Sequence, residues 1–132
     1  MTRDALTQRV GELTEAVLAD PRWQQDDVSV TVLGMILYGF ALATGRIVMF
    51  LDMDDIDAAV LSCLTERIGA PPKWSGGLVA EANASSMDRA HHAGHHQLIG
   101  VGHSYFFRIK DRSTQVDNVF ANIESVRRLT GT

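Results

Sequence analysis

The sequence has a single cysteine, Cys63, and only three prolines among 132 residues. One cysteine excludes an intramolecular disulfide, so the chain does not need an oxidising compartment to fold. The low proline count and a hydrophobic content of 45% exclude a disordered or linker-like chain. The N-terminal stretch MTRDALTQRVGELTEAV lacks the apolar core and the small-residue cleavage site of a secretory signal. Together these absences predict one cytoplasmic globular domain spanning residues 1–132.

The chain also lacks the motifs of the common catalytic classes. It contains no HExxH, no Cys-x-x-Cys and no Walker motif, and residues 100–104, GVGHS, match neither GxSxG nor GxGxxG. Cys63 lies between Leu61 and Leu64 in an amphipathic segment, where a small buried thiol is the ordinary explanation. We therefore predict a protein that acts by binding and not by catalysis, with no cofactor.

Hydrophobic periodicity predicts an all-α fold. Apolar residues recur at helical spacing in three segments: Leu6, Val10, Leu13 and Val17; Ile56, Val60, Leu64 and Ile68; and Val116, Val119, Phe120, Ile123 and Val126. Asp52 and the acids after it predict the start of the second helix, and Gly69 predicts its end. Ser113 or Thr114 is the expected cap of the third helix, and Gly131 follows its end.

The segment from Val28 to Gly45 is uncharged over 18 residues, the lower limit for a helix that spans a membrane. Acids flank it on both sides and Arg46 interrupts the apolar run, so we expect the buried central helix of a soluble bundle and no membrane association. Residues 78–90 favour a helix of small residues, and residues 98–110 favour either a buried helix or a short hairpin. The expected architecture is a single bundle of five or six helices around residues 28–44.

A turn-rich loop is expected at residues 70–77, APPKWSGG. Trp74 within it is either an anchor packed on the core or an exposed contact residue.

All five histidines, His91, His92, His95, His96 and His103, lie in the stretch HHAGHHQLIGVGH. On a helix, two pairs spaced four residues apart would each present two imidazoles on one face, the geometry that zinc-binding helices use. A protein zinc site needs three or four ligands, however, and no acid or cysteine between Asp88 and Asp111 completes one locally. We expect no metal, and keep a metal-binding protein or metal-dependent enzyme built on these five histidines as the alternative.

Charge is distributed unevenly along the chain. Residues 1–66 carry 11 acids and 4 bases, a net charge of −7, whereas residues 67–132 carry 5 acids and 8 bases, a net charge of +3. Nucleic acid is a poor partner for the first half, because phosphate binding needs clustered Lys and Arg. A basic protein partner fits better, since complementary potentials steer association.

The chain shares several general features with one class of bacterial proteins. These features are its small size, the acidic run DMDDID at 52–57, and the isolated aromatic residues Trp23, Trp74 and Tyr105, which could anchor an interface. In them the chain resembles the small, all-helical, cytoplasmic immunity proteins of polymorphic-toxin and contact-dependent growth inhibition systems.

The resemblance implies that a monomer or homodimer binds and neutralises a cognate protein toxin. If that toxin is a nuclease domain with a basic cleft, the expected contacts are a phosphate mimic formed by Asp54, Asp55, Asp57 and Glu66, with Trp74 beside them. No direct contact with nucleic acid is implied. A third class, a structural or oligomeric helical module, would use the small residues Gly34, Gly39, Ala41 and Ala43 for close helix packing.

Overall fold

The computed structural model describes residues 2–131, and these residues form six α-helices and no strand. The helices are α1 Arg3–Leu18, α2 Asp27–Leu42, α3 Met53–Ser62, α4 Pro72–Met87, α5 Ala93–Phe107 and α6 Arg112–Thr130. Two π-helices, η1 Ala43–Val48 and η2 Cys63–Ile68, directly continue α2 and α3. The all-α class expected from the apolar periodicity is confirmed.

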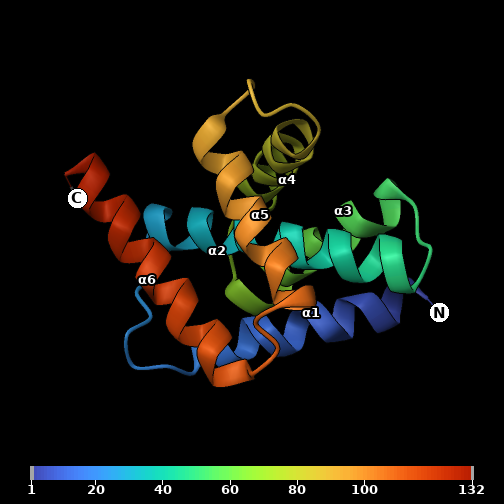
Figure 1. Ribbon diagram of the computed structural model, residues 1–132, viewed down its shortest axis with the longest axis horizontal. Coiled ribbons are helices and arrows are strands. Elements are labelled where there is room, and N and C mark those ends of the chain that lie inside the picture. Colours follow the sequence, from blue (N-terminus) through green and yellow to red (C-terminus); the bar gives the residue numbers. More distant parts are fainter. Residues whose placement is uncertain (1, 132) are drawn as a thin grey trace.

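Helix α2 is the centre of the molecule and contacts each of the other five α-helices (Figure 1). Its residues Leu33, Ile36 and Tyr38 are 0% exposed. Asp27–Val48 is the one helical stretch in the described part of the chain that is long and apolar enough to cross a membrane, and 83% of its most apolar window is buried inside the protein. A stretch buried to this extent is the core helix that the sequence predicts.

Helix α5 crosses α2 with the two backbones in contact. A Cβ atom on Gly39 would lie 1.8 Å from the carbonyl oxygen of Ile99, and a Cβ atom on Gly102 would lie 1.8 Å from the carbonyl oxygen of Ile36. Residues 98–110 therefore do not form the hairpin considered above. Gly102, which suggested a break, instead permits a continuous helix to lie directly on the core helix. Gly39 is likewise used for packing within the chain.

Two helix starts differ from expectation. Asp111, and not Ser113 or Thr114, caps α6, and its Oδ2 accepts from the Thr114 backbone N–H at 3.1 Å. Helix α4 begins at Pro72, inside the expected loop at 70–77. Proline is tolerated there because the first residue of a helix has no use for its N–H.

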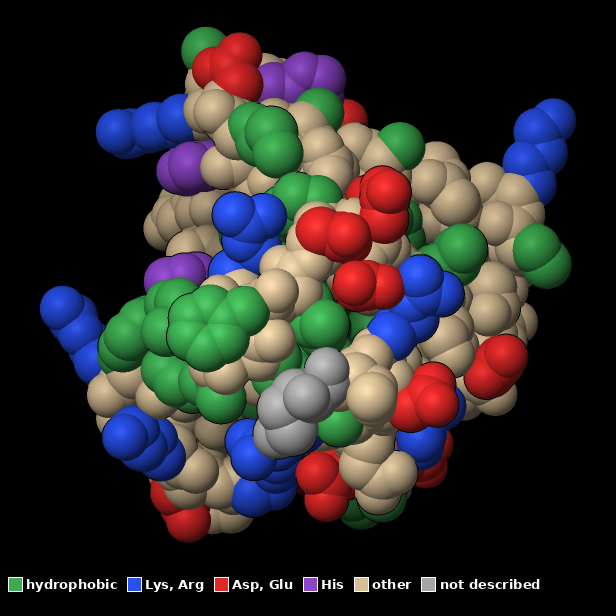
Figure 2. Space-filling model, turned by 90° about the vertical axis from the view of Figure 1, so that its right-hand side faces the viewer, with side chains coloured by type: hydrophobic (Ala, Val, Ile, Leu, Met, Phe, Trp, Pro, Cys, Tyr) green, Lys and Arg blue, Asp and Glu red, His purple; other side chains and the backbone are tan. Residues whose placement is uncertain are grey.

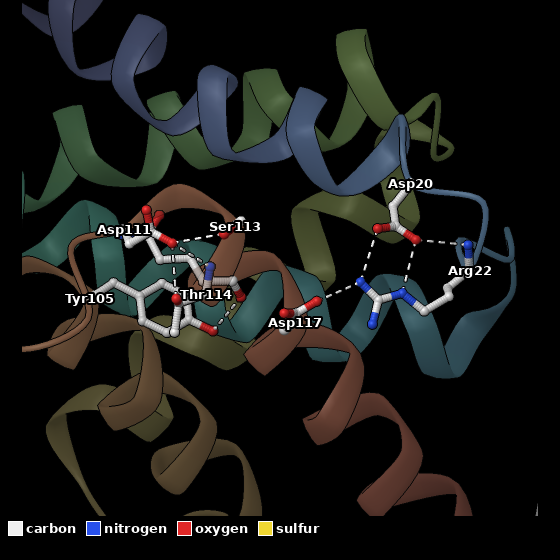
Figure 3. A network of polar contacts seen from close by, with 8 residues as sticks. Asp20, Arg22, Tyr105, Asp111, Ser113, Thr114 and Asp117 are labelled. Carbon is white, nitrogen blue, oxygen red and sulfur yellow. Dashed lines mark hydrogen bonds and ion pairs between the residues drawn. The ribbon is translucent and has the colours of Figure 1, made fainter.

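The loop between α1 and α2 is attached to α6 by Arg22 (Figure 3). Its guanidinium donates to Asp20 at 2.9 Å and to Asp117 at 2.8 Å, and lies 4.4 Å from the centre of the Phe120 ring. The hydrogen bonds from Arg22 lower the pKa of Asp20 to about 2. These contacts pack the two distant segments together.

Candidate functional site

The four acids predicted to contact a partner point in different directions. Asp55 forms an ion pair with Arg3 of α1 at 2.9 Å. Glu66 accepts a hydrogen bond from the Ser62 hydroxyl at 3.0 Å. With a rise of about 1.5 Å per helical residue, Glu66 lies roughly 13 Å from Asp57 along the helix axis. Asp54 is exposed and has no polar partner among residues 2–131. Of the four, Asp54 is the one without a polar partner in the described part of the chain, and Glu66, which is also exposed, is bonded only to Ser62 one turn before it.

Asp57 is turned inward, toward a buried tyrosine. Tyr38 donates from Oη to Asp57 Oδ1 at 2.6 Å, and Asn83 donates from Nδ2 to Tyr38 Oη at 3.1 Å and to Asp57 at 3.3 Å. Burial, and then the neighbouring Asp57 carboxylate, raise the pKa of Tyr38 well above its usual value. The three side chains join α2, α3 and α4, so Asp57 serves the fold.

The aromatic residues predicted to anchor an interface are mostly packed. Tyr105 is 1% exposed, and Trp23 and Trp74 are partly buried against the core. Trp74 lies on α4 and lines a shallow hollow of about 340 Å³ with Val30 and Pro71. Trp74 therefore matches the packed alternative, with one edge open to solvent.

Four of the five histidines are hydrogen-bonded within the fold, and the ring of the fifth, His103, lies with its centroid 5.3 Å from that of Phe107. Helix α5 begins at Ala93, so the expected pairs within one helix do not form. His92 instead caps the helix, accepting at Nδ1 from the His95 backbone N–H at 3.0 Å, and its ring stacks on that of His95 with centroids 3.5 Å apart. His96 Nδ1 lies 2.8 Å from the Ser85 carbonyl oxygen.

Glu81 of α4 joins two of the histidines. Its carboxylate oxygens lie 2.9 Å from His91 Nε2 and 2.8 Å from His95 Nδ1. Hydrogen bonds from His95 and then from His91 lower the pKa of Glu81 to about 2. Across residues 2–131, no three His, Cys, Asp or Glu side chains are grouped as metal ligands would be. The cluster attaches the start of α5 to α4.

Phe50 is a candidate that the sequence reasoning missed. It follows η1 in the connection to α3, is 87% exposed, and has a φ of +57°, the left-handed backbone region. Ile47 and Val48 beside it are 46% and 39% exposed. The available signal was an apolar run, IVMFL, in a connection where turn residues are usual.

We call Ile47, Val48, Phe50, Asp52 and Asp54 the Phe50 surface. Figure 2 faces this end of the molecule, which lies on the right in Figure 1, and shows hydrophobic side chains gathered beside a group of acidic ones. Lys and Arg side chains lie at the margin of the same view and also directly beside the acidic group. The end therefore combines exposed apolar side chains with the exposed acids Asp52 and Asp54, and the exposed Arg46 precedes them in the chain.

A second apolar feature lies at the opposite end of α2. Helices α2, α5 and α6 form a groove of about 480 Å³, lined by Val32, Leu98, Val126 and Leu129 among others. Leu129 is 86% exposed. This groove has a more regular backbone than the Phe50 surface, since its apolar residues lie within helices.

Comparison of the chain with protein-family models, with curated proteins and with solved structures finds no match.

Proposed function

We propose that this protein is an immunity protein that neutralises a cognate bacterial toxin by binding it, and that the Phe50 surface makes the contact. The observation that carries the proposal is the exposed Phe50, with Ile47 and Val48, next to the unpaired carboxylate of Asp54. Apolar residues exposed together mark interaction sites more often than isolated ones. Aromatic residues at the centre of such a site supply much of the binding energy.

Charge supports a basic partner. Residues 46–57 contain four acids and one base, Arg46; of the acids, Asp52 and Asp54 are exposed. Electrostatic complementarity would speed the encounter with a cationic toxin, such as a nuclease domain with a basic cleft. Of the four acids of the phosphate-mimic hypothesis, Asp54 is the one that remains near Phe50, because Arg3 neutralises Asp55, Asp57 is bonded to Tyr38, and Glu66 lies on η2. Asp52, the exposed N-cap of α3, adds a second carboxylate that the hypothesis did not include. Binding would take place in the cytoplasm, where such a toxin acts.

The proposal is tested by co-expression in a bacterial host. The gene that adjoins this one is induced alone and together with the gene for this protein, and growth is followed. We expect the neighbouring product to stop growth, the co-expressed protein to restore it, and the two chains to purify as a one-to-one complex. A neighbouring product that is harmless, or whose toxicity persists, would count against neutralisation.

Charge reversal locates the contact. Asp54→Lys should weaken protection, because it places a cation against a cationic partner without breaking any contact in the fold. Glu124→Lys is the matched control: the same change at an exposed acid on α6, at the other end of the molecule. Equal protection by the two variants would argue against an acidic contact at the start of α3.

A further inference from the structure

Helices α2 and α3 end in the same hydrogen-bonded motif. Each is followed by a π-helix, and after each π-helix one residue is left-handed: Phe50 at φ +57° and Gly69 at φ +82°. The residue that follows then donates its N–H to the carbonyl six positions back, Leu51 to Gly45 and Ala70 to Leu64, both at 2.9 Å. Phe50 and Gly69 therefore occupy equivalent positions.

The position is one that glycine normally fills. Glycine adopts left-handed φ values without penalty, whereas a Cβ atom crowds the backbone there, most of all in a bulky residue. The third left-handed residue in the described part of the chain, Gly131 at the end of α6, follows the rule. Phe50 is the exception, and its backbone conformation is unfavourable.

Packing within the chain does not account for the exception. Phe50 is 87% exposed, so its ring gains little burial to offset the backbone cost. Strained residues are concentrated at binding and catalytic sites, where the strain holds a side chain in a useful position. The motif fixes Phe50 at the tip of a short connection with its ring directed to solvent.

The surroundings of the ring define what would cover it. Ile47 and Val48 extend the apolar area, the exposed Arg46 precedes them, and the two exposed acids Asp52 and Asp54 follow at the start of α3. A membrane surface fits poorly, because anionic lipids repel these carboxylates. A protein with an apolar pocket and Lys or Arg at its rim would match both the ring and the acids.

We infer that Phe50 is a preformed anchor that inserts into an apolar pocket of a partner protein, while Asp52 and Asp54 meet cationic side chains at the rim of that pocket. This inference rests on the proposed function for its premise that the partner is a protein. Beyond that function, the inference names Phe50 as the residue that supplies most of the binding energy, and it states the chemistry of the partner surface that receives the ring. The left-handed backbone, held by the bond from Leu51 N–H to Gly45, already fixes the direction of the Phe50 Cα–Cβ bond, which reduces the backbone ordering needed on binding.

The test uses a random peptide library displayed on phage and selected on the immobilised full-length protein. Enriched peptides are synthesised, and their affinities are measured by fluorescence anisotropy for the wild type and for three variants. Phe50→Ala removes the ring and Asp54→Asn removes the charge. Leu129→Ala is the matched control, because Leu129 is 86% exposed and lies at the α2–α5–α6 groove.

The expected peptides combine apolar residues with Lys or Arg. Their affinity should fall at least roughly 10-fold for Phe50→Ala and roughly 3-fold for Asp54→Asn, the scale of a buried anchor and of a rim charge, with no change for Leu129→Ala. Peptides that lose affinity only with Leu129→Ala would overturn the inference and place binding in the groove. Failure to enrich any peptide sensitive to Phe50→Ala would overturn it as well.

Two other occupants are distinguished by direct measurement. A dimer in sedimentation velocity that Phe50→Ala disperses would make a second copy of the chain the occupant. Binding to vesicles containing one-third anionic lipid that Phe50→Ala abolishes would make it a membrane. Either result would overturn the inference.

The Phe50 anchor and the proposed immunity function can fail independently of each other. If the toxin is neutralised and Phe50→Ala still protects, the anchor is wrong and the function stands. If no toxin is neutralised while the peptide results hold, the anchor stands and the function is wrong.

Discussion

Exchanging Phe50 for glycine and for alanine isolates the cost of the left-handed backbone. Both variants lose the ring, but only glycine relieves the conformation, so their difference in unfolding free energy reports the strain. A left-handed residue other than glycine costs about 1–2 kcal/mol. Glycine loses more conformational freedom on folding than alanine does, and this offsets about 0.5–1 kcal/mol of the stability gained by relieving the strain.

The expected result is that Phe50→Gly is more stable than Phe50→Ala by about 0.8 kcal/mol. Because Phe50 is 87% exposed, loss of the ring removes only about 25 Å² of contact from a side chain of about 200 Å², or roughly 0.6 kcal/mol. Phe50→Gly should therefore be about as stable as the wild type. In thermal unfolding, the two variants should differ by about 3 °C.

Urea unfolding followed by circular dichroism measures these differences, and Gly69→Ala is the control at the equivalent position. Its free energy of unfolding should be about 0.8 kcal/mol lower than that of the wild type, because alanine introduces at position 69 the backbone strain that glycine avoids. A Phe50→Gly variant less stable than Phe50→Ala would refute the reasoning, because it would mean that a side chain at this position benefits the fold.

Three further predictions concern the core and the histidine cluster. Gly102→Ala should cost at least about 2 kcal/mol in urea unfolding, because its methyl group would overlap the α2 backbone; Gly100→Ala, with no atom within 4 Å, should gain up to about 1 kcal/mol from helix propensity. Tyr38→Phe should cost about 2 kcal/mol by the same assay, because it removes the hydrogen bond to the Asp57 carboxylate. The pKa of Glu81 falls from 4.5 to about 2 on folding. The ionised carboxylate therefore stabilises the folded protein fully above pH 4.5, and this contribution is lost as pH falls toward 2. The free energy of unfolding, measured from pH 6 to pH 2.5, should decline more steeply in the wild type than in Glu81→Gln.

Each of these has an outcome that contradicts it. Equal stabilities of the Gly102→Ala and Gly100→Ala variants would mean that α5 does not touch the α2 backbone. An unchanged Tyr38→Phe variant would mean that Asp57 gains nothing from the tyrosine. Parallel pH curves for the wild type and Glu81→Gln would mean that the carboxylate is not held by His91 and His95.

The fold was predictable where local pattern and tertiary packing agree. The stripe Ile56, Val60, Leu64 and Ile68 is buried as expected, and Asp52 caps its helix through Asp55 N–H at 3.0 Å. The start of α4 was missed because Pro72 indicates a loop or a first helical residue equally well. The helical state of residues 98–107 depends on the Ile36 carbonyl that Gly102 faces, a contact between residues far apart in the sequence.

The candidate site was less predictable for two physical reasons. The acids were identified by type, but whether a carboxylate is free depends on partners distant in sequence, such as Arg3 for Asp55 and Tyr38 for Asp57. The left-handed end of η1 escaped notice because such ends are recognised by glycine, and this one holds Phe50. An unusual residue at such a position is visible only once the backbone is known.

The most direct test of the central claim is the affinity of Phe50→Gly, relative to the wild type, for a peptide selected on the full-length protein. The claim predicts that this variant unfolds at the same urea concentration as the wild type and yet binds at least roughly 10-fold more weakly. Unchanged affinity in a folded Phe50→Gly variant would contradict it, and the binding surface would have to be sought elsewhere on the molecule.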